Sequence, residues 1–342
     1  MFPRHLNNHD SFIVPLLLLA IHCVCQGFVL PVSQNEKANS AVESMFDCRF
    51  DQAMTTVDSM NADSADAPLK WMLRLSIIGM RHLDYDDVSD SNYFETTYEA
   101  TQLLFKNYEK QRGRTSYFLT AHGFGCCIAA AYKMHNKEYL KGIQLGFEAI
   151  SNCREAKKID SVNTDVDLIL GLYSYARAEL KRKFWGIIFW YPGDKNTGVR
   201  SIVNASKTGQ FSSLAAQAAL LEINIREAHY DTAKAGLDVL LNLYPHSRFL
   251  MWSKVKLCDA QKLYANSADT YALLADAYEI IPGAARNYHQ TRFFETQRYY
   301  RAGNFDKAAA ACDKLLETCA DRPMEHCDEA KKIREKIKKS YH

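Results

Sequence analysis

Tyr230-Asp231-Thr232-Ala233 opens a stretch that continues through Leu237, Leu240 and Leu241 to Pro245. The three leucines follow the tyrosine at positions +7, +10 and +11. They therefore share one face of a helix with about 3.6 residues per turn. Asp231 lies near the start of this helix, where a carboxylate caps free N–H groups and meets the positive end of the helix dipole. Pro245 ends the helix because it has no N–H and crowds the preceding turn.

The aromatic-Asp-x-Ala tetrad occurs at two further places. One begins at Phe305 after a turn that contains Gly303, and the other begins at Phe50 near the start of the chain. A degenerate version begins at Tyr139. The last residue of each full tetrad is small where a neighbouring helix must come close, namely Ala53, Ala233 and Ala308. The pattern resembles the second helix of a tetratricopeptide repeat, a two-helix unit of about 34 residues.

This resemblance implies an all-α fold, a right-handed α-solenoid of tetratricopeptide-like helix pairs. The first helix before Tyr230 would cover about 213–228, with Asn224 where the family usually has an aromatic residue. The aromatic anchors Phe50, Tyr139, Tyr230 and Phe305 are 89, 91 and 75 residues apart. Each gap exceeds two repeat periods, so we predict one poorly marked repeat plus inserted residues in each. The segment 255–281 is the expected repeat in the last gap.

Composition indicates an ordinary water-exposed surface around an ample core. Of the 342 residues, 47% are hydrophobic and 24% are charged. The 42 Lys and Arg residues against 40 Asp and Glu leave a net charge of +2. A nucleic-acid-binding protein normally shows a strongly basic face, so we expect no nucleic-acid partner.

The N-terminus resembles a secretory signal peptide. Arg4 and His5 precede the apolar run 12–21, and Cys23, Cys25 and Gly27 follow it. The run is shorter than the roughly 20 residues of a membrane-spanning helix, which favours cleavage near Cys25–Gly27 over retention as an anchor. We therefore expect an exported protein of a bacterial periplasm or cell envelope.

These patterns divide the chain into consecutive segments. The expected order is a signal peptide at 1–27, a polar lead-in at 28–44, degenerate repeat-like helices at 45–160, a central helix and aromatic connection at 161–212, and C-terminal repeats with a charged capping helix at 213–340. In the first half we expect helices at about 46–60, 69–82, 92–112 and 115–135, with an acidic, solvated loop at 84–90.

The central segment carries a second resemblance. A Leu-Gly-x-Tyr helix around Gly171 leads into the aromatic run 184–191, and a Gly-Asp turn at Asp194 precedes another helix. This order is similar to that of bacterial exported tetratricopeptide proteins distantly related to the eukaryotic inclusion-body-clearance repeat family. The resemblance covers about residues 45–320 and implies no catalytic residues.

The aromatic run 184–191 allows two interpretations. It either fills a gap between helix pairs, or it forms a lip where Trp185 and Trp190 hold an apolar partner segment or touch a membrane surface. The first interpretation is favoured, because large aromatic side chains are usually buried. The run is too short to span a bilayer.

Cysteine and histidine positions give weaker signals. Cys319 and Cys327 bracket a loop and are the best disulfide candidates among the eight cysteines that follow the leader. His122 and Cys126 are spaced four residues apart on a helix, a spacing that can bind zinc. A third ligand at matching spacing is missing, so buried packing is favoured. We expect no metal site, no cofactor and no catalytic group.

The sequence thus favours a non-enzymatic scaffold that binds a polypeptide in a concave groove lined by first helices. The expected contact residues are Asn224, Arg226, Arg292 and Tyr299, with Trp185 and Trp190. The alternatives are a small-ligand-binding protein or hydrolase on the same scaffold, and a structural envelope protein with no exchangeable ligand.

Overall fold

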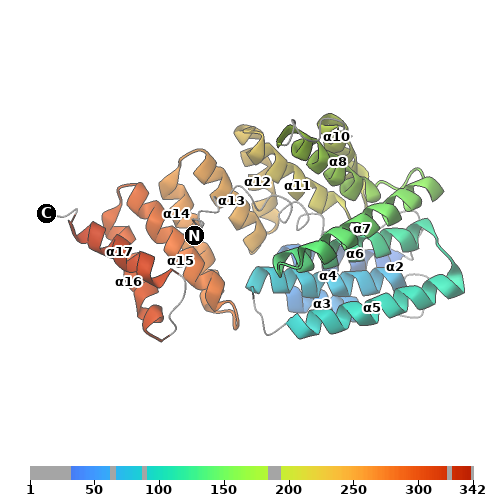
Figure 1. Ribbon diagram of the computed structural model, residues 1–342, viewed down its shortest axis with the longest axis horizontal. Coiled ribbons are helices and arrows are strands. Elements are labelled where there is room, and N and C mark those ends of the chain that lie inside the picture. Colours follow the sequence, from blue (N-terminus) through green and yellow to red (C-terminus); the bar gives the residue numbers. More distant parts are fainter. Residues whose placement is uncertain (1–31, 62–66, 87–90, 184–193, 322–325, 340–342) are drawn as a thin grey trace. The chain divides into compact units, whose positions relative to one another are not determined.

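The computed structural model describes residues 32–61, 67–86, 91–183, 194–321 and 326–339. These residues form 15 helices and no strand, which confirms the all-α prediction (Figure 1). The helices are α2 (Val32–Phe46), α3 (Phe50–Asp58), α4 (Ala67–Tyr85), α5 (Ser91–Arg112), α6 (Ser116–His135), α7 (Tyr139–Ile159), α8 (Val166–Lys183), α10 (Lys195–Thr208), α11 (Ser213–Arg226), α12 (Tyr230–Leu243), α13 (Arg248–Ala260), α14 (Tyr264–Glu279), α15 (Ala285–Arg301), α16 (Phe305–Asp321) and α17 (Cys327–Lys339).

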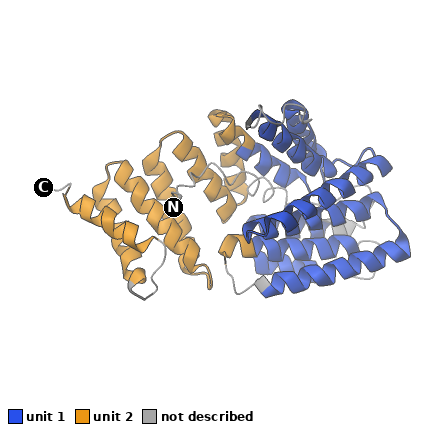
Figure 2. Ribbon diagram, viewed as in Figure 1, with its two compact units in different colours: residues 1–81, 92–222 blue, residues 82–91, 223–342 orange. Residues whose placement is uncertain are grey.

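The chain divides into two compact units, coloured separately in Figure 2. The first unit comprises residues 1–81 and 92–222, and the second comprises residues 82–91 and 223–342. The last residues of α4 therefore belong to the second unit, although the helix begins in the first.

Five pairs of consecutive helices are joined by the same short turn. In the last pair, α15–α16, the N–H of Gly303 donates to the carbonyl of Tyr300 (3.1 Å), and the N–H of Asn304 donates to that of Tyr299 (2.9 Å). These two bonds define the Schellman motif, which needs a residue in the left-handed region. The residues with positive φ at the five turns are Cys48, Lys137, Ala228, Lys262 and Gly303.

An aromatic residue opens the second helix after each of these turns, two positions beyond the residue with positive φ. Three positions later stands a small, buried residue. The aromatic residues are Phe50, Tyr139, Tyr230, Tyr264 and Phe305, and the small ones are Ala53, Gly142, Ala233, Ser267 and Ala308. A Cβ on Gly142 would lie 2.6 Å from Cγ of Met134, so this position must be small for the two helices to pack.

The first unit is built around α6, whose small residues allow α7 to lie close along it. A Cβ on Gly123 would lie 2.9 Å from Sγ of Cys153 on α7. The absence of a side chain at Gly123 thus lets the two helices pack closely. Aromatic rings from α5 cover the other side of α6, where Phe94 stacks on Tyr132 with ring centroids 3.8 Å apart.

Helices α8 and α10 meet at two glycines. A Cβ on Gly198 would lie 2.7 Å from the carbonyl oxygen of Gly171, so neither position admits a side chain without movement. Asp194 caps α10 by accepting hydrogen bonds from the N–H groups of Asn196 and Thr197. The cap agrees with the predicted Gly-Asp turn before a helix.

The structure differs from expectation in the N-terminal part. We predicted a polar lead-in through residue 44 and one helix from Phe46 to Met60. Instead, residues 32–46 form α2, a turn follows, and α3 begins at Phe50. The polar stretch is helical because Ala38, Ala41 and Val42 are buried on one side of it, and it packs on α3 as the first helix of a pair.

The start of the acidic segment 84–90 also differs from the solvated loop that we predicted. Asp84 lies in the last turn of α4 and is buried in the second unit. Its carboxylate accepts hydrogen bonds from Arg248 on α13 and from the hydroxyl of Tyr278 on α14. Residues 87–90, which include Asp87 and Asp90, lie outside the described residues.

Two expectations from the sequence concern residues that the structure does not describe. The signal peptide at 1–27 and the aromatic run 184–191, with Trp185 and Trp190, both lie outside the described ranges. Within those ranges, every helix is too short or too polar to cross a membrane.

Candidate functional site

Arg292, one of the expected contact residues, is 2% exposed on α15. Its Nη1 donates to Oε2 of Glu295 over 2.8 Å, and its Nη2 pairs with Asp276 on α14. The acidic partner on α14 is more than half exposed, whereas the guanidinium is covered. A partner molecule would therefore meet the acidic side chains of α14 before it reached Arg292.

Tyr299 is also covered, with its ring in the core beside Ala268 and Ala308. Its hydroxyl donates to Oδ1 of Asp269 over 2.7 Å, and Lys307 binds the same oxygen at 3.2 Å. The hydrogen bond from Tyr299 is the largest cause that lowers the pKa of Asp269. Tyr299 thus fixes a carboxylate at the surface.

The other two described candidates lie on α11. Asn224 is half-buried, and its carbonyl accepts the N–H of His229 in the turn before α12. Arg226 is exposed at the end of the same helix. The structure joins Arg292 and Tyr299 to acidic residues of α14, whereas Asn224 and Arg226 lie on α11.

Large exposed apolar side chains gather elsewhere, on the second helices of the pairs and on α5. Within the described ranges, α6, α11, α13 and α15, which are first helices, carry none. The sequence signal for this surface was the set of apolar residues that lie outside the buried face of each helix. The members on second helices are Tyr139, Leu140, Ile143, Phe147 and Ile159 on α7, Val239 and Leu243 on α12, and Leu273 on α14.

Helix α7 has the most continuous of these surfaces. Leu140 is 80% exposed and Phe147 is 55% exposed, and Ile143 lies between them on the same side of the helix. We call these three residues the α7 stripe. The stripe leads into an open pocket of about 320 Å³ lined by Phe147, Ile150, Ser151, Arg154, Glu155 and Lys158.

The pocket end of α7 carries positive charge. Arg154 and Lys158 are exposed and stand one helical turn apart, and Arg154 lies over the ring of Tyr173 at 5.4 Å. The one acidic residue among the lining side chains, Glu155, is bound by Nε and Nη2 of Arg114 at 2.9 and 2.7 Å. Since that carboxylate is already neutralised, the two basic side chains set the charge at this end.

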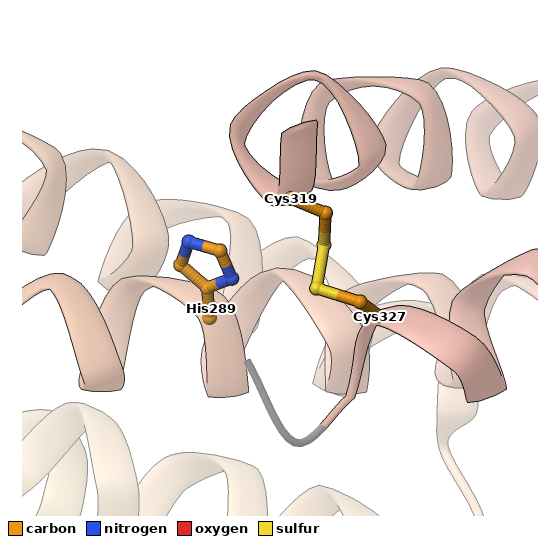
Figure 3. Close-up of side chains that lie close together, drawn as sticks. All are labelled: His289, Cys319 and Cys327. Carbon is orange, nitrogen blue, oxygen red and sulfur yellow. A yellow bond between two sulfur atoms is a disulfide. The ribbon is translucent and has the colours of Figure 1, made fainter. Parts of the chain in front are cut away.

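A different cluster joins α15 to the last two helices. Cys319 and Cys327, the best disulfide candidates in the sequence, form a disulfide, and His289 lies beside it (Figure 3). All three residues are buried and their ligand atoms lie within 4.8 Å of one another. Both sulfur atoms are joined to each other, so the cluster acts as a crosslink between α16 and α17.

Comparison with known proteins adds no identity. No family model matches the chain, and no curated protein or solved structure matches it significantly.

Proposed function

We propose that this chain is an exported helical-repeat scaffold of the tetratricopeptide type, without enzymatic activity, that binds a polypeptide partner. The repeated turn supports the repeat assignment: the same Schellman bonds, opening aromatic residue and small buried residue recur at five helix pairs. Tyr230 and Tyr264 are 34 residues apart, which equals the period of about 34 residues typical of this repeat.

The contact surface with the best support is the α7 stripe with its basic pocket end. Exposed apolar side chains at helical spacing mark an interaction site more than scattered ones do. From Leu140 to Arg154 the surface extends about 21 Å, because a helix rises about 1.5 Å per residue. We therefore propose that the partner presents an amphipathic helix, with apolar residues on the stripe and acidic residues facing Arg154 and Lys158.

The location in a cell envelope or periplasm rests on two supports. The sequence begins with the signal-like pattern around residues 12–27. The Cys319–Cys327 disulfide belongs to the kind of bond that persists in oxidising compartments. The proposal includes cleavage of the leader, which can be tested by determining the N-terminal residue of the mature protein.

A site-specific crosslink tests the proposed surface. A photoreactive amino acid replaces Phe147 on α7, and in a matched variant it replaces Val239, an exposed apolar residue on α12. Irradiation in the producing cell should give an adduct with a second polypeptide at 147 and none at 239. Mass spectrometry of the adduct should place the crosslink in an acidic, amphipathic segment of the partner.

Three outcomes overturn the proposal. These are no adduct at 147, equal adducts at 147 and 239, and an adduct at 147 that contains only a second copy of this chain.

A further inference from the structure

His122 and Cys126 face a third side chain that the sequence alone did not connect to them. Both lie on α6, one turn apart, and Glu148 on α7 brings its carboxylate to the same point. One ligand atom from each residue, an imidazole nitrogen, the thiol sulfur and a carboxylate oxygen, lies within 4.8 Å of the others. Nε2 of His122 lies 3.6 Å from Oε1 of Glu148.

A further oxygen, from Gln102 on α5, lies beside His122. Oε1 of Gln102 lies 3.2 Å from Nε2 of His122. In a tetrahedral zinc site, bonds of about 2.0–2.3 Å set neighbouring ligand atoms roughly 3.3–3.7 Å apart. The two edges that His122 makes, with Gln102 and with Glu148, are close to this length.

The chemistry of the set suits zinc. Nitrogen, thiolate and carboxylate ligands are all common in zinc sites. A thiolate and a carboxylate together balance the charge of one divalent ion, which removes the cost of burying a net charge next to α6. Cys126 is fully buried and the His122 side chain is 13% exposed, whereas Glu148 is 48% exposed and gives an ion a route in from solvent.

We propose that His122, Cys126 and Glu148 form a zinc-binding site, with the side-chain oxygen of Gln102 as the fourth ligand. The site joins α5, α6 and α7 within the first unit. Binding displaces the proton of the Cys126 thiol to solvent, while the histidine binds through a neutral nitrogen. The ion would thus act as a clamp between three helices and would not depend on the proposed partner surface.

Cobalt and zinc titrations of the full chain test the proposal. Purified, metal-free protein should bind one Zn²⁺ per chain in calorimetry. Co²⁺ should give a sulfur-to-cobalt charge-transfer band with intense visible bands of tetrahedral geometry. Cys126→Ala should abolish the charge-transfer band, and Cys127→Ala, which changes the adjacent buried thiol, should keep it.

Glu148→Gln provides a second test if the cysteine variant fails to fold. Because Glu148 is exposed, this substitution should leave the fold intact. This variant should keep the thiolate band and weaken zinc binding by more than about tenfold, since even changes outside the ligand shell cost about 10–100-fold. Glu155→Gln, on the same helix, should leave zinc affinity unchanged. The proposal is overturned if no thiolate band forms in the parent protein, if Cys126→Ala keeps the band, or if Glu148→Gln binds zinc as tightly as the parent.

Discussion

Arg248 on α13 donates from Nε to Oδ2 of Asp84, a residue 164 positions earlier in the chain, over 2.8 Å. A second hydrogen bond from Nη2 reaches the same oxygen, and the Tyr278 hydroxyl donates to the other carboxylate oxygen over 2.9 Å. The end of α4 is thereby fixed inside the second unit. The acidic segment that looked like a surface loop in the sequence supplies a buried anchor.

Removal of this anchor should strongly destabilise the second unit. Asp84→Asn leaves the guanidinium of Arg248 buried without its counter-charge, which should cost about 3–5 kcal/mol in the free energy of unfolding. Asp328→Asn is the matched control, because the Asp328–Lys331 pair is largely exposed and should contribute less than about 1 kcal/mol. Urea unfolding monitored by circular dichroism measures both, and equal losses would contradict the anchor role.

Replacement of two glycines in the second unit by alanine should change stability in opposite directions. Gly303 has φ +74 and a Cβ there would meet nothing within 4 Å, so Gly303→Ala should cost about 1–2 kcal/mol through backbone strain alone. Gly236 lies within α12 with equally open space, and Gly236→Ala should stabilise by about 0.5–1 kcal/mol. Thermal unfolding of the two variants should shift in opposite directions; a shift in the same direction would contradict the left-handed turn.

Tyr299 should control the acid titration of Asp269. Because its hydrogen bond lowers the pKa of Asp269 below the ordinary value of 3.8, Tyr299→Phe should raise that pKa in an NMR titration. The folded pKa is the lower one, so this stabilisation is present above about pH 3.8 and is lost as pH falls through the folded pKa. The stability difference between parent and variant should therefore narrow in acid. An unchanged pKa of Asp269 in the variant would contradict this role of Tyr299.

The Cys319–Cys327 crosslink should stabilise the C-terminal helices. The two residues are eight positions apart, and closing so short a loop in the unfolded chain is worth about 2–3 kcal/mol. A reductant should lower the unfolding midpoint of the parent protein but not that of a Cys319→Ser, Cys327→Ser double variant. If the reductant changes the unfolding midpoint of neither protein, the disulfide does not form.

The sequence predicted the second helices well because their signals are local. Tyr230 and Phe305 each open a helix as expected, and the helix after Tyr230 ends just before Pro245. Tyr264 was missed because no Asp follows it and Ser267 replaces the alanine. Its helix fell within the segment 255–281 that we expected to hold a poorly marked repeat.

The turns before these helices were harder to predict. Among the five turn residues, only Gly303 is of a type that favours the left-handed conformation. The other four adopt it without being glycine, namely Cys48, Lys137, Ala228 and Lys262. At these positions the backbone hydrogen bonds and the packing of two helices outweigh the local preference of the residue.

Contacts between distant segments could not be predicted from one sequence. The spacing of His122 and Cys126 allows a zinc ligand pair, but we expected buried packing because the sequence shows no third ligand. Glu148 comes to them only because α7 folds back along α6. The same holds for Asp84 and Arg248. Burial of Arg292 and Tyr299 likewise depends on α14 packing against α15, which helical periodicity within α15 does not reveal.

The most direct test of the proposed function is the crosslink yield from position 147 after charge reversal at the pocket end of α7. Arg154→Glu with Lys158→Glu should nearly abolish the adduct with the acidic partner, because like charges then face each other. Lys106→Glu with Lys110→Glu makes the same charge change on exposed residues of α5 and should preserve it. An adduct that survives reversal of Arg154 and Lys158 at the parent yield would contradict the account.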